Sequence, residues 1–334
     1  MGDATMLILS ADDLRRALPM GQAMEAVASA FAQLADQQAD VPLRLRLAVP
    51  SQEGTALVMP AFLAESGALG LKLLSIFPHN PELHHLPVIN ALVLLLDTEN
   101  GLPLALMDGG WLTALRTGAA SGVATRLMAR QDARVLALFG AGAQALPQAW
   151  AVCVARAIER IWLVNRTPAN AERLAQQLRA FGSPIPADVR VAPSAQDALR
   201  EADVICCATS SAAPLFEDAD LRPGVHINGI GSYLPTMQEV PAATVARARV
   251  IVDERRAAWA EAGDLIIPRD QGLIAETHVA GELGEVVTRQ VAGRTAPDQI
   301  TFFKSVGLAV QDVATAQAAY QQARTLGIGT EVSL

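Results

Sequence analysis

Hydrophobic and polar residues alternate in short runs along the first third of the chain, and this pattern predicts a sheet. In VPLRLRLAVP, three leucines fall on one face of a strand and two arginines, Arg44 and Arg46, on the other. Further strand-like runs occupy residues 55–63, 68–77, 88–97 and 102–108. The pair Asn100-Gly101 between the last two is a strong hairpin-turn signal. The sheet is therefore predicted to be mostly antiparallel, with a helix over residues 23–34 before it.

After residue 108 the pattern changes to alternating helices and strands. A helix rich in small residues is predicted over 109–130 as a connector, followed by strands at 135–139, 161–164, 189–191, 204–209, 225–229, 250–253 and 301–305. Helices such as 168–181 lie between the strands, which predicts an α/β fold with a Rossmann-type, doubly wound parallel sheet over 119–304. A last helix, from 306 to about 324, is expected to return to the first domain. That mixed α/β domain is then discontinuous, formed by residues 1–118 and 305–334.

Composition and charge exclude several classes of protein. Of the 334 residues, 51% are hydrophobic, which excludes a largely disordered chain. The formal net charge of −8 and the lack of a basic run argue against nucleic-acid binding. The apolar runs are far shorter than the roughly 18 residues that span a bilayer. The amino-terminal segment MGDATMLILSADDL has no basic region and does not resemble a signal peptide, so a cytoplasmic protein is expected.

The cysteines do not suggest a disulfide framework or a metal site. The chain has three, Cys153, Cys206 and Cys207, and all lie in apolar segments. We expect them to be buried apolar residues.

A glycine-rich turn after the strand VLALF is typical of a dinucleotide site. It reads Gly140-x-Gly142-x-x-Ala145, with Ala143 and Gln144 completing the turn before a helix. The first glycine allows the tight turn, the second lets the backbone approach a pyrophosphate, and the alanine keeps helix and strand close. The phosphates would lie at the amino end of the helix. The alternative is a packing turn in a domain without a cofactor.

Three other segments bear on the cofactor. The second strand ends in Asn165-Arg166-Thr167, without the acid that NAD enzymes usually place there, and its arginine suits a 2′-phosphate. NADP (as NADPH) is therefore the expected cofactor, with NAD as the second choice; the alternative is an exposed turn. Two further loops follow strand ends and are candidates for the ribose and nicotinamide, or ordinary turns: Ala208-Thr209-Ser210, and the loop with Gly231 and Ser232.

Four basic residues in or beside apolar segments of the first domain predict a site for a small acid: Arg44, Arg46, Lys72 and Arg116. Converging cations hold a carboxylate, and arginine offers a bidentate contact. The alternative is that each is a solvated surface residue. That alternative is weakest for Lys72, inside the apolar strand ALGLKLLSIF, because lysine is seldom buried without a partner.

These segments together resemble the ornithine cyclodeaminase/mu-crystallin family over nearly the whole chain. The resemblance is carried by RLRLAVP, GLKLLSIFPHN, LTALRTGAAS, FGAGAQA, IWLVNRT, PGVHINGIGSYLPTMQEV and FKSVGLAVQD. It implies a Rossmann domain and a domain for substrate binding and dimerisation, usually in a homodimer. It also implies carboxylate-binding roles for Arg46, Lys72 and Arg116, with Arg44 as the alternative to Arg46. The implied cofactor positions are Thr117 near the phosphates, Val306 and Gly307 beside the nicotinamide, and Asn165, Arg166 and Thr167 as an NADPH-type triplet.

Two departures from the family pattern indicate the subgroup. Ornithine cyclodeaminases carry an acid where this chain has Tyr233, and a second acid where it has Leu57. Without these carboxylates nothing would hold the distal ammonium of ornithine or act as a base there. A planar aromatic ring suits a flat cyclic imine.

The sequence therefore predicts NADPH-dependent reduction of a cyclic ketimine carboxylate, a small anionic imino acid. The expected reaction converts Δ1-pyrroline-2-carboxylate to L-proline, with Δ1-piperideine-2-carboxylate to L-pipecolate as a second one. The expected catalytic residues are Lys72, Arg116, Arg46 and Tyr233, and Arg44 and Ser232 are added as substrate contacts. The alternatives are an ornithine cyclodeaminase, an alanine-dehydrogenase-like enzyme, and a non-catalytic ligand-binding protein of the crystallin type.

Overall fold

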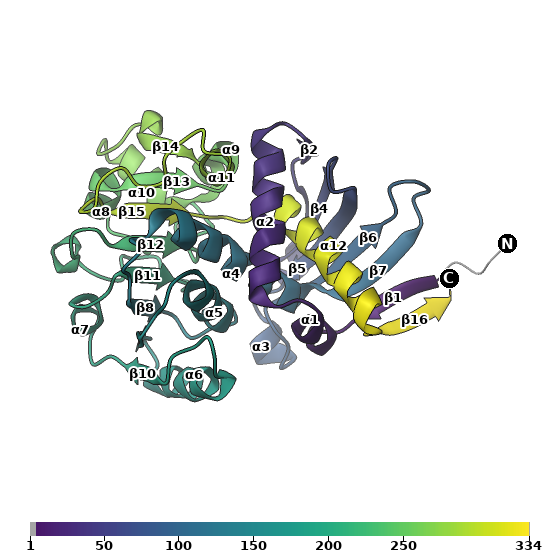
Figure 1. The fold of residues 1–334 in the computed structure, drawn as a ribbon, viewed down its shortest axis with the longest axis horizontal. Coiled ribbons are helices and arrows are strands. Elements are labelled where there is room, and N and C mark those ends of the chain that lie inside the picture. Colours follow the sequence, from purple (N-terminus) through teal and green to yellow (C-terminus); the bar gives the residue numbers. More distant parts are fainter. Residues whose placement is uncertain (1–4, 334) are drawn as a thin grey trace. The chain divides into compact units, whose positions relative to one another are not determined.

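The computed structural model describes residues 5–333 (Figure 1). Residue 334 and residues 1–4 lie outside the described part. Residues 1–4 begin the amino-terminal segment that was compared above with signal peptides. The chain divides into two compact units. One is formed by the chain up to Arg116 and from Leu308 onward, and the other is Thr117–Gly307. Each unit has its own eight-stranded sheet.

The sheet of the first unit is mostly antiparallel, as predicted. Its strands run in the order β16-β1-β7-β6-β5-β4-β2, with β3 paired to β4. Their bounds are β1 Thr5–Leu9, β2 Ala39–Asp40, β3 Leu45–Val49, β4 Gly54–Leu63, β5 Ala68–Ile76, β6 Ile89–Leu96, β7 Pro103–Asp108 and β16 Thr330–Ser333. The predicted hairpin joins β6 and β7, with Gly101 at φ 76°. The sequence pattern missed β1 and β16, which pair with each other, and β1 adds the one parallel pairing of this sheet among the described residues.

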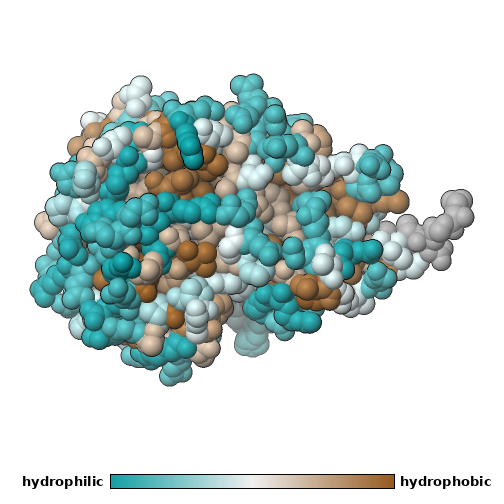
Figure 2. Space-filling view, viewed as in Figure 1, coloured by the Kyte–Doolittle hydropathy of each residue, from teal (hydrophilic) through white to brown (hydrophobic). Residues whose placement is uncertain are grey.

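Helices cover one face of this sheet. The helices of this unit are α1 Ala11–Ala17, α2 Met20–Ala35, α12 Ala309–Leu326 and the start of α4, Gly109–Met128, and a short helix without buried residues, α3 Asn80–Leu83. In Figure 1, α2 and α12 lie side by side in front of the sheet, and α12 contacts α2, β4, β5 and β6. The last helix therefore returns to the first unit, as predicted. Figure 2 takes the same view and shows the helix-covered side of this unit, where hydrophilic residues cover much of the surface.

The alternation of β4 and β5 decides which side chains meet the helices. Leu57, Met59 and Lys72 are buried on the covered face. On the opposite face, Leu73 pairs across the sheet with Val58 and Leu92 and is 43% exposed. The sheet thus has one buried face and one open apolar face.

The sheet of the second unit is parallel at every pairing between its described strands. The order is β10-β9-β8-β11-β12-β15-β13-β14. The strands are β8 Val135–Phe139, β9 Arg160–Val164, β10 Asp188–Val191, β11 Val204–Cys207, β12 His226–Gly229, β13 Arg249–Val252, β14 Val279–Glu282 and β15 Thr301–Lys304. The helices are the rest of α4, α5 Ala145–Ala155, α6 Pro168–Phe181, α7 Ala195–Leu199, α8 Ala242–Arg247, α9 Arg255–Glu261, α10 Gly263–Asp270 and α11 Leu283–Val287. This confirms the predicted doubly wound sheet, and the strand order reverses between β8 and β11.

The central strands are buried on both faces, which explains their uninterrupted apolar sequences. All four residues of β11 are buried, including Cys206 and Cys207. All three cysteines are buried and free, as predicted. Burial raises the pKa of Cys153 and of Cys206 to about 12, so these thiols stay protonated at neutral pH. Among the described helices, none is long and apolar enough to cross a membrane.

Candidate active site

Two of the predicted cations meet a single carboxylate inside the first unit. Lys72 Nζ of β5 lies 2.8 Å from Asp312 Oδ2 of α12, and Arg116 Nε of α4 donates to Asp312 Oδ1 at 3.0 Å. Arg116 Nη1 also donates to Gln311 Oε1 at 2.6 Å. All four side chains are buried. The structure therefore excludes the reading of Lys72 and Arg116 as solvated surface residues.

The amino-terminal turn of α12 supplies the partners that the cations need. Gln311 Oε1 accepts a hydrogen bond from the backbone N–H of Leu308, which caps the helix, and the same oxygen receives Arg116. The Gln311 amide nitrogen is buried without a hydrogen-bond partner in the described chain. Sequence reasoning missed Gln311 and Asp312, although both belong to the FKSVGLAVQD segment. A polar pair inside an otherwise apolar helix start was the available signal.

The environment of Lys72 makes its proton easier to lose. Burial lowers the pKa of Lys72 to about 8, the Asp312 carboxylate opposes this change, and Arg116 and Arg44 add to it. The ammonium thus stays mostly protonated at neutral pH but releases its proton near pH 8. A group of this kind can act as a proton donor under physiological conditions.

The structure favours Arg44 over Arg46 as the third cation. The β3 register places Arg46 opposite Leu57, and its Nη2 donates to Thr55 Oγ1 at 3.4 Å. Extending that register by one pair places Arg44 opposite Met59, whose partner on β5 is Lys72. Arg44 also contributes to the lowered pKa of Lys72. The alternative residue therefore fits the cluster better than Arg46, which is exposed.

The glycine-rich turn of the second unit has the geometry of a phosphate-binding turn. Gly140 has φ 103°, and a side-chain carbon there would lie 2.4 Å from the carbonyl oxygen of Ala208. Gly142 has no atom within 4 Å of such a carbon, so its backbone faces open space. Ala145 begins α5 and is fully buried against the strand side. The geometry of each residue is thus compatible with the role that the motif predicts.

The residues around this turn fit a dinucleotide. Gly142 and Ala143 are exposed at the amino end of α5, where backbone N–H groups bind phosphates. The side-chain oxygen of Gln144 is buried and has no partner in the described chain. An orphaned polar atom beside an open backbone cradle is what a bound nucleotide would satisfy. Thr117, the other residue assigned near the phosphates, is buried in α4.

The turn after β9 exposes a cation. Asn165 Nδ2 donates to the carbonyl oxygen of Thr167 at 2.9 Å and so braces the turn. Arg166 and Thr167 are exposed. The arginine is therefore free to approach a ligand lying along the carboxyl edge of the sheet.

Buried carboxylates hold the loops at the carboxyl ends of the other strands. Asp253 Oδ2 accepts hydrogen bonds from Ser305 Oγ and from the N–H groups of Val306 and Gly307, at 2.7–2.8 Å. Burial raises the pKa of Asp253, and these hydrogen bonds partly offset that. A second carboxylate, Glu239, binds the loops after β11 and β12. Sequence reasoning missed both acids, although Asp253 directly follows the apolar strand VIV.

Two predicted substrate residues lie in the loop after β12. Ser232 is fully buried, and its Oγ donates to the carbonyl oxygen of Met237 at 2.8 Å. Its hydroxyl is therefore engaged within the protein. Tyr233 is 40% exposed, so its ring is accessible.

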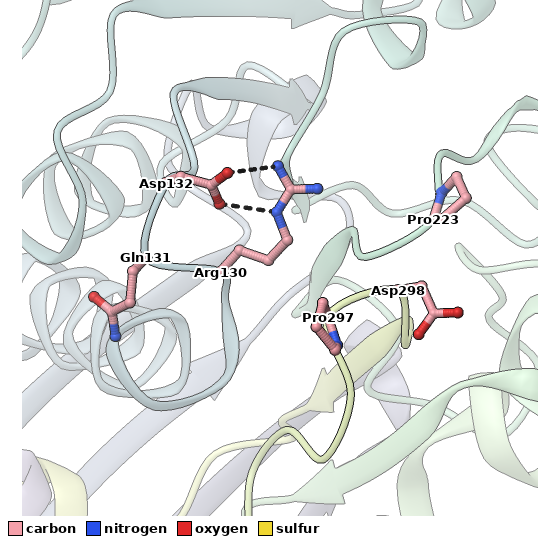
Figure 3. Close-up of a pocket in the computed structure, with 6 residues that line it drawn as sticks. All are labelled: Arg130, Gln131, Asp132, Pro223, Pro297 and Asp298. Atoms are coloured by element: carbon pink, nitrogen blue, oxygen red, sulfur yellow. Dashed lines mark hydrogen bonds and ion pairs between the residues drawn. The ribbon is translucent and has the colours of Figure 1, made fainter.

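A cavity of about 560 Å³ in the second unit lies at the amino ends of the strands of the sheet (Figure 3). It is lined by Arg130, Gln131, Asp132, Pro223, Pro297 and Asp298, which precede β8, β12 and β15. Arg130 pairs there with Asp132 at 2.9 Å. Ligands of such sheets bind at the carboxyl ends, so this cavity is not the nucleotide site. No group of three or more metal-ligating side chains occurs within residues 5–333.

Comparisons with known proteins agree with this geometry. A Δ1-pyrroline-2-carboxylate reductase from Bacillus cereus is 39% identical over 98% of this chain and 99% of its own. The solved Thermococcus litoralis Δ1-pyrroline-2-carboxylate reductase, in complex with NADH and L-proline, matches with TM-score 0.92 and 39% identity, covering 98% of this chain and 100% of that one. An alanine dehydrogenase from Archaeoglobus fulgidus is 33% identical over 98% of both chains. The model of the ornithine cyclodeaminase/mu-crystallin family matches residues 4–326, and the chain belongs to that family, as its motifs predicted.

Proposed function

We propose that the protein is an NAD(P)H-dependent reductase of cyclic ketimine carboxylates. Its main reaction would convert Δ1-pyrroline-2-carboxylate to L-proline, and Δ1-piperideine-2-carboxylate to L-pipecolate would be a second one. The observation that carries this proposal is the buried Lys72–Asp312–Arg116 cluster, a site for an anion beside a proton donor. The Bacillus and Thermococcus relatives, both named for the first reaction, support it.

The cluster carries a net positive charge that a substrate carboxylate would neutralise. Asp312 balances only one of the two cations that it contacts, Lys72 and Arg116. Arg116 and Arg44 bind the carboxylate through their guanidinium groups. The unpaired Gln311 amide nitrogen is a further donor for that carboxylate.

The reduction adds one hydride and one proton across the C=N bond. The nicotinamide cofactor, when bound, supplies the hydride for the imine carbon. Lys72 donates the proton to the imine nitrogen, because its ammonium is protonated at neutral pH and its pKa, near 8, makes transfer easy. Asp312 holds the ammonium in place, and the neutral Lys72 amine that remains after the transfer takes up a proton from solvent before the next turnover.

The residues at positions 57 and 233, where ornithine cyclodeaminases carry acids, disfavour cyclodeamination. Leu57 is buried and apolar on the face of the sheet that carries Lys72. Tyr233 carries a phenol rather than a carboxylate and is 40% exposed. Neither can pair with the distal ammonium of ornithine.

The proposed cofactor is NADPH rather than NADH. Arg166 is exposed after β9, where an acid would bind the ribose hydroxyls of NAD. Losing a charge-assisted contact costs about 1.5–3 kcal/mol, which is roughly 10- to 150-fold in affinity. Arg166→Asp should weaken NADPH binding by this factor and leave NADH nearly unchanged. Equal weakening of both, or of neither, would contradict the assignment.

The decisive test offers three substrate pairs to the wild-type protein. They are Δ1-pyrroline-2-carboxylate with NADPH or NADH, ornithine with NAD⁺, and pyruvate with ammonia and NADH. We expect rapid oxidation of the reduced cofactor only with the cyclic imine. Arg116→Ala should raise KM and lower kcat at least tenfold, while Arg15→Ala, an exposed arginine of the same unit, should change neither. Turnover of ornithine or pyruvate instead, or of nothing, would favour one of the alternatives.

We further propose that the protein is a homodimer joined through the open face of the first sheet. Leu43, Leu45 and Leu47 are 64–70% exposed there, and Leu73 and Leu92 continue the same apolar surface. A contiguous apolar patch that is exposed on a soluble protein is a common mark of a protein–protein interface. Leu45→Lys with Leu73→Lys should convert the dimer to a monomer in analytical ultracentrifugation. A monomeric wild type, or an unchanged dimer in the variant, would contradict the interface.

A further inference from the structure

Glu239 joins two loops of the second unit that are separate in the sequence. Its Oε1 accepts hydrogen bonds from the N–H and the hydroxyl of Thr209, both at 2.7 Å, in the loop after β11. Its Oε2 accepts from the N–H groups of Gly231 at 2.6 Å and Ser232 at 3.1 Å, in the loop after β12. Each carboxylate oxygen thus holds one loop, and Glu239 itself is fully buried.

A second buried acid fixes the position of Glu239. The N–H groups of Glu239 and Val240 both donate to Asp264 Oδ1, at 2.7 and 3.0 Å. Asp264 Oδ2 lies 3.3 Å from Lys304 Nζ, which donates to the carbonyl oxygen of Gly229 at the end of β12. Lys304 and Asp264 are fully buried. The Glu239 carboxylate is therefore part of a charged network with no access to solvent.

The approach of the two loops leaves no room for side-chain atoms at Gly231. A carbon added there would lie 2.0 Å from the carbonyl oxygen of Thr209 and 2.5 Å from Glu239 Oε1. The backbones are thus in direct contact, and the carboxylate lies against both. A longer or shorter acid at position 239 could not hold the same arrangement.

The place of these loops in the sheet connects them with one half of a dinucleotide. The glycine-rich turn follows β8, and the Asn165-Arg166-Thr167 turn follows β9, on one side of the point where the strand order reverses. The two loops held by Glu239 follow β11 and β12, on the other side. The contact between Gly140 and Ala208 sets the β11 loop directly beside the phosphate turn. A dinucleotide lying across that point places its adenosine half on the first side and its other half on the second.

We propose that Glu239 is a positioning residue for the nicotinamide-ribose half of the cofactor. It holds the β11 and β12 loops in one shape before the cofactor binds, so that binding does not have to order them. This assignment rests on the proposed function, because it assumes a nicotinamide dinucleotide at this edge. A glutamine cannot replace Glu239: whichever way its amide turns, an NH₂ group faces one loop, and the backbone N–H groups of that loop lose their acceptor.

The test compares the whole cofactor with fragments that lack the nicotinamide half. NADPH and NADH binding is followed by dihydronicotinamide fluorescence, and binding of ADP and adenosine 2′,5′-bisphosphate by calorimetry. Glu239→Gln should weaken the reduced dinucleotides at least about tenfold and the fragments less than about threefold. The control is Asp203→Asn, because Asp203 also accepts two backbone hydrogen bonds, from Arg134 and Val135, but at the amino edge of the sheet. Asp203→Asn should lower the melting temperature, and any change in affinity should be the same for the dinucleotides and for the fragments.

Equal weakening of cofactor and fragments by Glu239→Gln, or no weakening, would overturn the assignment. If Glu239→Gln does not fold, Thr209→Val replaces it, since it removes one donor to the carboxylate. This variant should weaken binding of the reduced dinucleotides about two- to fivefold more than binding of the fragments. Failure of the wild-type protein to bind either dinucleotide would instead overturn the proposed function, and this assignment with it.

Discussion

Asp312→Asn is the substitution that most directly tests the chemistry proposed for Lys72. It keeps the size of the side chain and the hydrogen bond that Arg116 donates, but removes the negative charge 2.8 Å from Lys72 Nζ. Lys72 is then left in a buried site with cations only. Its pKa, about 8 in the native protein, should fall further.

Coulomb's law gives the order of magnitude of the change for a pair of charges in close contact. Two unit charges about 4 Å apart interact with about 4 kcal/mol at an effective dielectric constant of about 20. One pKa unit corresponds to about 1.4 kcal/mol, so full loss of this attraction would lower the pKa by about 3. With relaxation of the surroundings, we expect the Lys72 pKa to fall by about 2, to roughly 6.

The assay is the pH profile of kcat/KM with the cyclic imine and saturating reduced cofactor. Lys72 donates its proton, so activity is present below its pKa and is lost as pH rises through it. The wild-type profile should fall above about pH 8, and the Asp312→Asn profile above roughly pH 6. Asp13→Asn, which removes a helix-capping carboxylate in the same unit, is the control and should leave the profile in place.

One result would refute the reasoning. If Asp312→Asn folds, as shown by its thermal unfolding, and its alkaline limb coincides with that of the wild type, then Lys72 does not set the limb. A limb caused by titration of the imine itself would behave in this way, since a substitution in the protein cannot move the pKa of the free substrate.

The same geometry makes three further predictions. Gly142→Ala should keep the wild-type melting temperature, because nothing lies near the added carbon, yet weaken cofactor binding about tenfold. Gly140→Ala, at φ 103° and against Ala208, should lower the melting temperature itself. Melting curves and a fluorescence titration of the cofactor distinguish the two effects. The free energy of unfolding should rise by about 1–3 kcal/mol as pH increases from about 8 to 10.5, because Lys72 keeps its proton in the unfolded chain and has lost it in the folded one. Urea titrations at several pH values measure this rise, and Lys72→Met should make it smaller. Tyr233→Asp should lower imine reduction without creating ornithine turnover, since Leu57 still supplies no acid; ammonia release from ornithine would contradict this.

The regular elements could be predicted because their signals are local. The strand–helix alternation of residues 135–253 and the Asn-Gly hairpin are readable within short windows, and the structure confirms both. The strands β1 and β16 could not be predicted in this way. TMLIL has no alternation, TEVS is polar, and the two pair with each other from opposite ends of the chain.

The candidate site was predictable on its cationic side and not on its acidic side. A lysine inside an apolar strand is conspicuous because it is costly to bury. An aspartate near the start of a helix is not, since acids are common and favourable there. Only the tertiary structure shows that Asp312 meets Arg116, 196 positions earlier in the chain. Glu239 and Asp253 could not be predicted for the same reason, since their partners also lie elsewhere in the sequence.

The choice between Arg44 and Arg46 shows a different limit. Both have the same parity in the strand, so periodicity puts them on one face and cannot separate them. The register of β3 on β4, extended by one residue beyond Leu45, makes the distinction, because it sets Arg44 in line with Met59 and Lys72. Register depends on pairing between strands, which one strand's sequence does not contain.

The buried acids of the two units have a common physical explanation. A buried ion pair adds little net stability compared with apolar side chains of the same volume, and removing one partner is strongly destabilising. Stability alone therefore does not account for Asp312, Glu239 and Asp253, each fully buried. What they share is that each holds groups that must stay in place: two cations for Asp312, and loop N–H groups at strand ends for the other two. A site preformed in this way binds its ligand without the entropic cost of ordering side chains and loops. Substitution of these acids should therefore change ligand binding and proton transfer in ways that an equal loss of stability elsewhere would not.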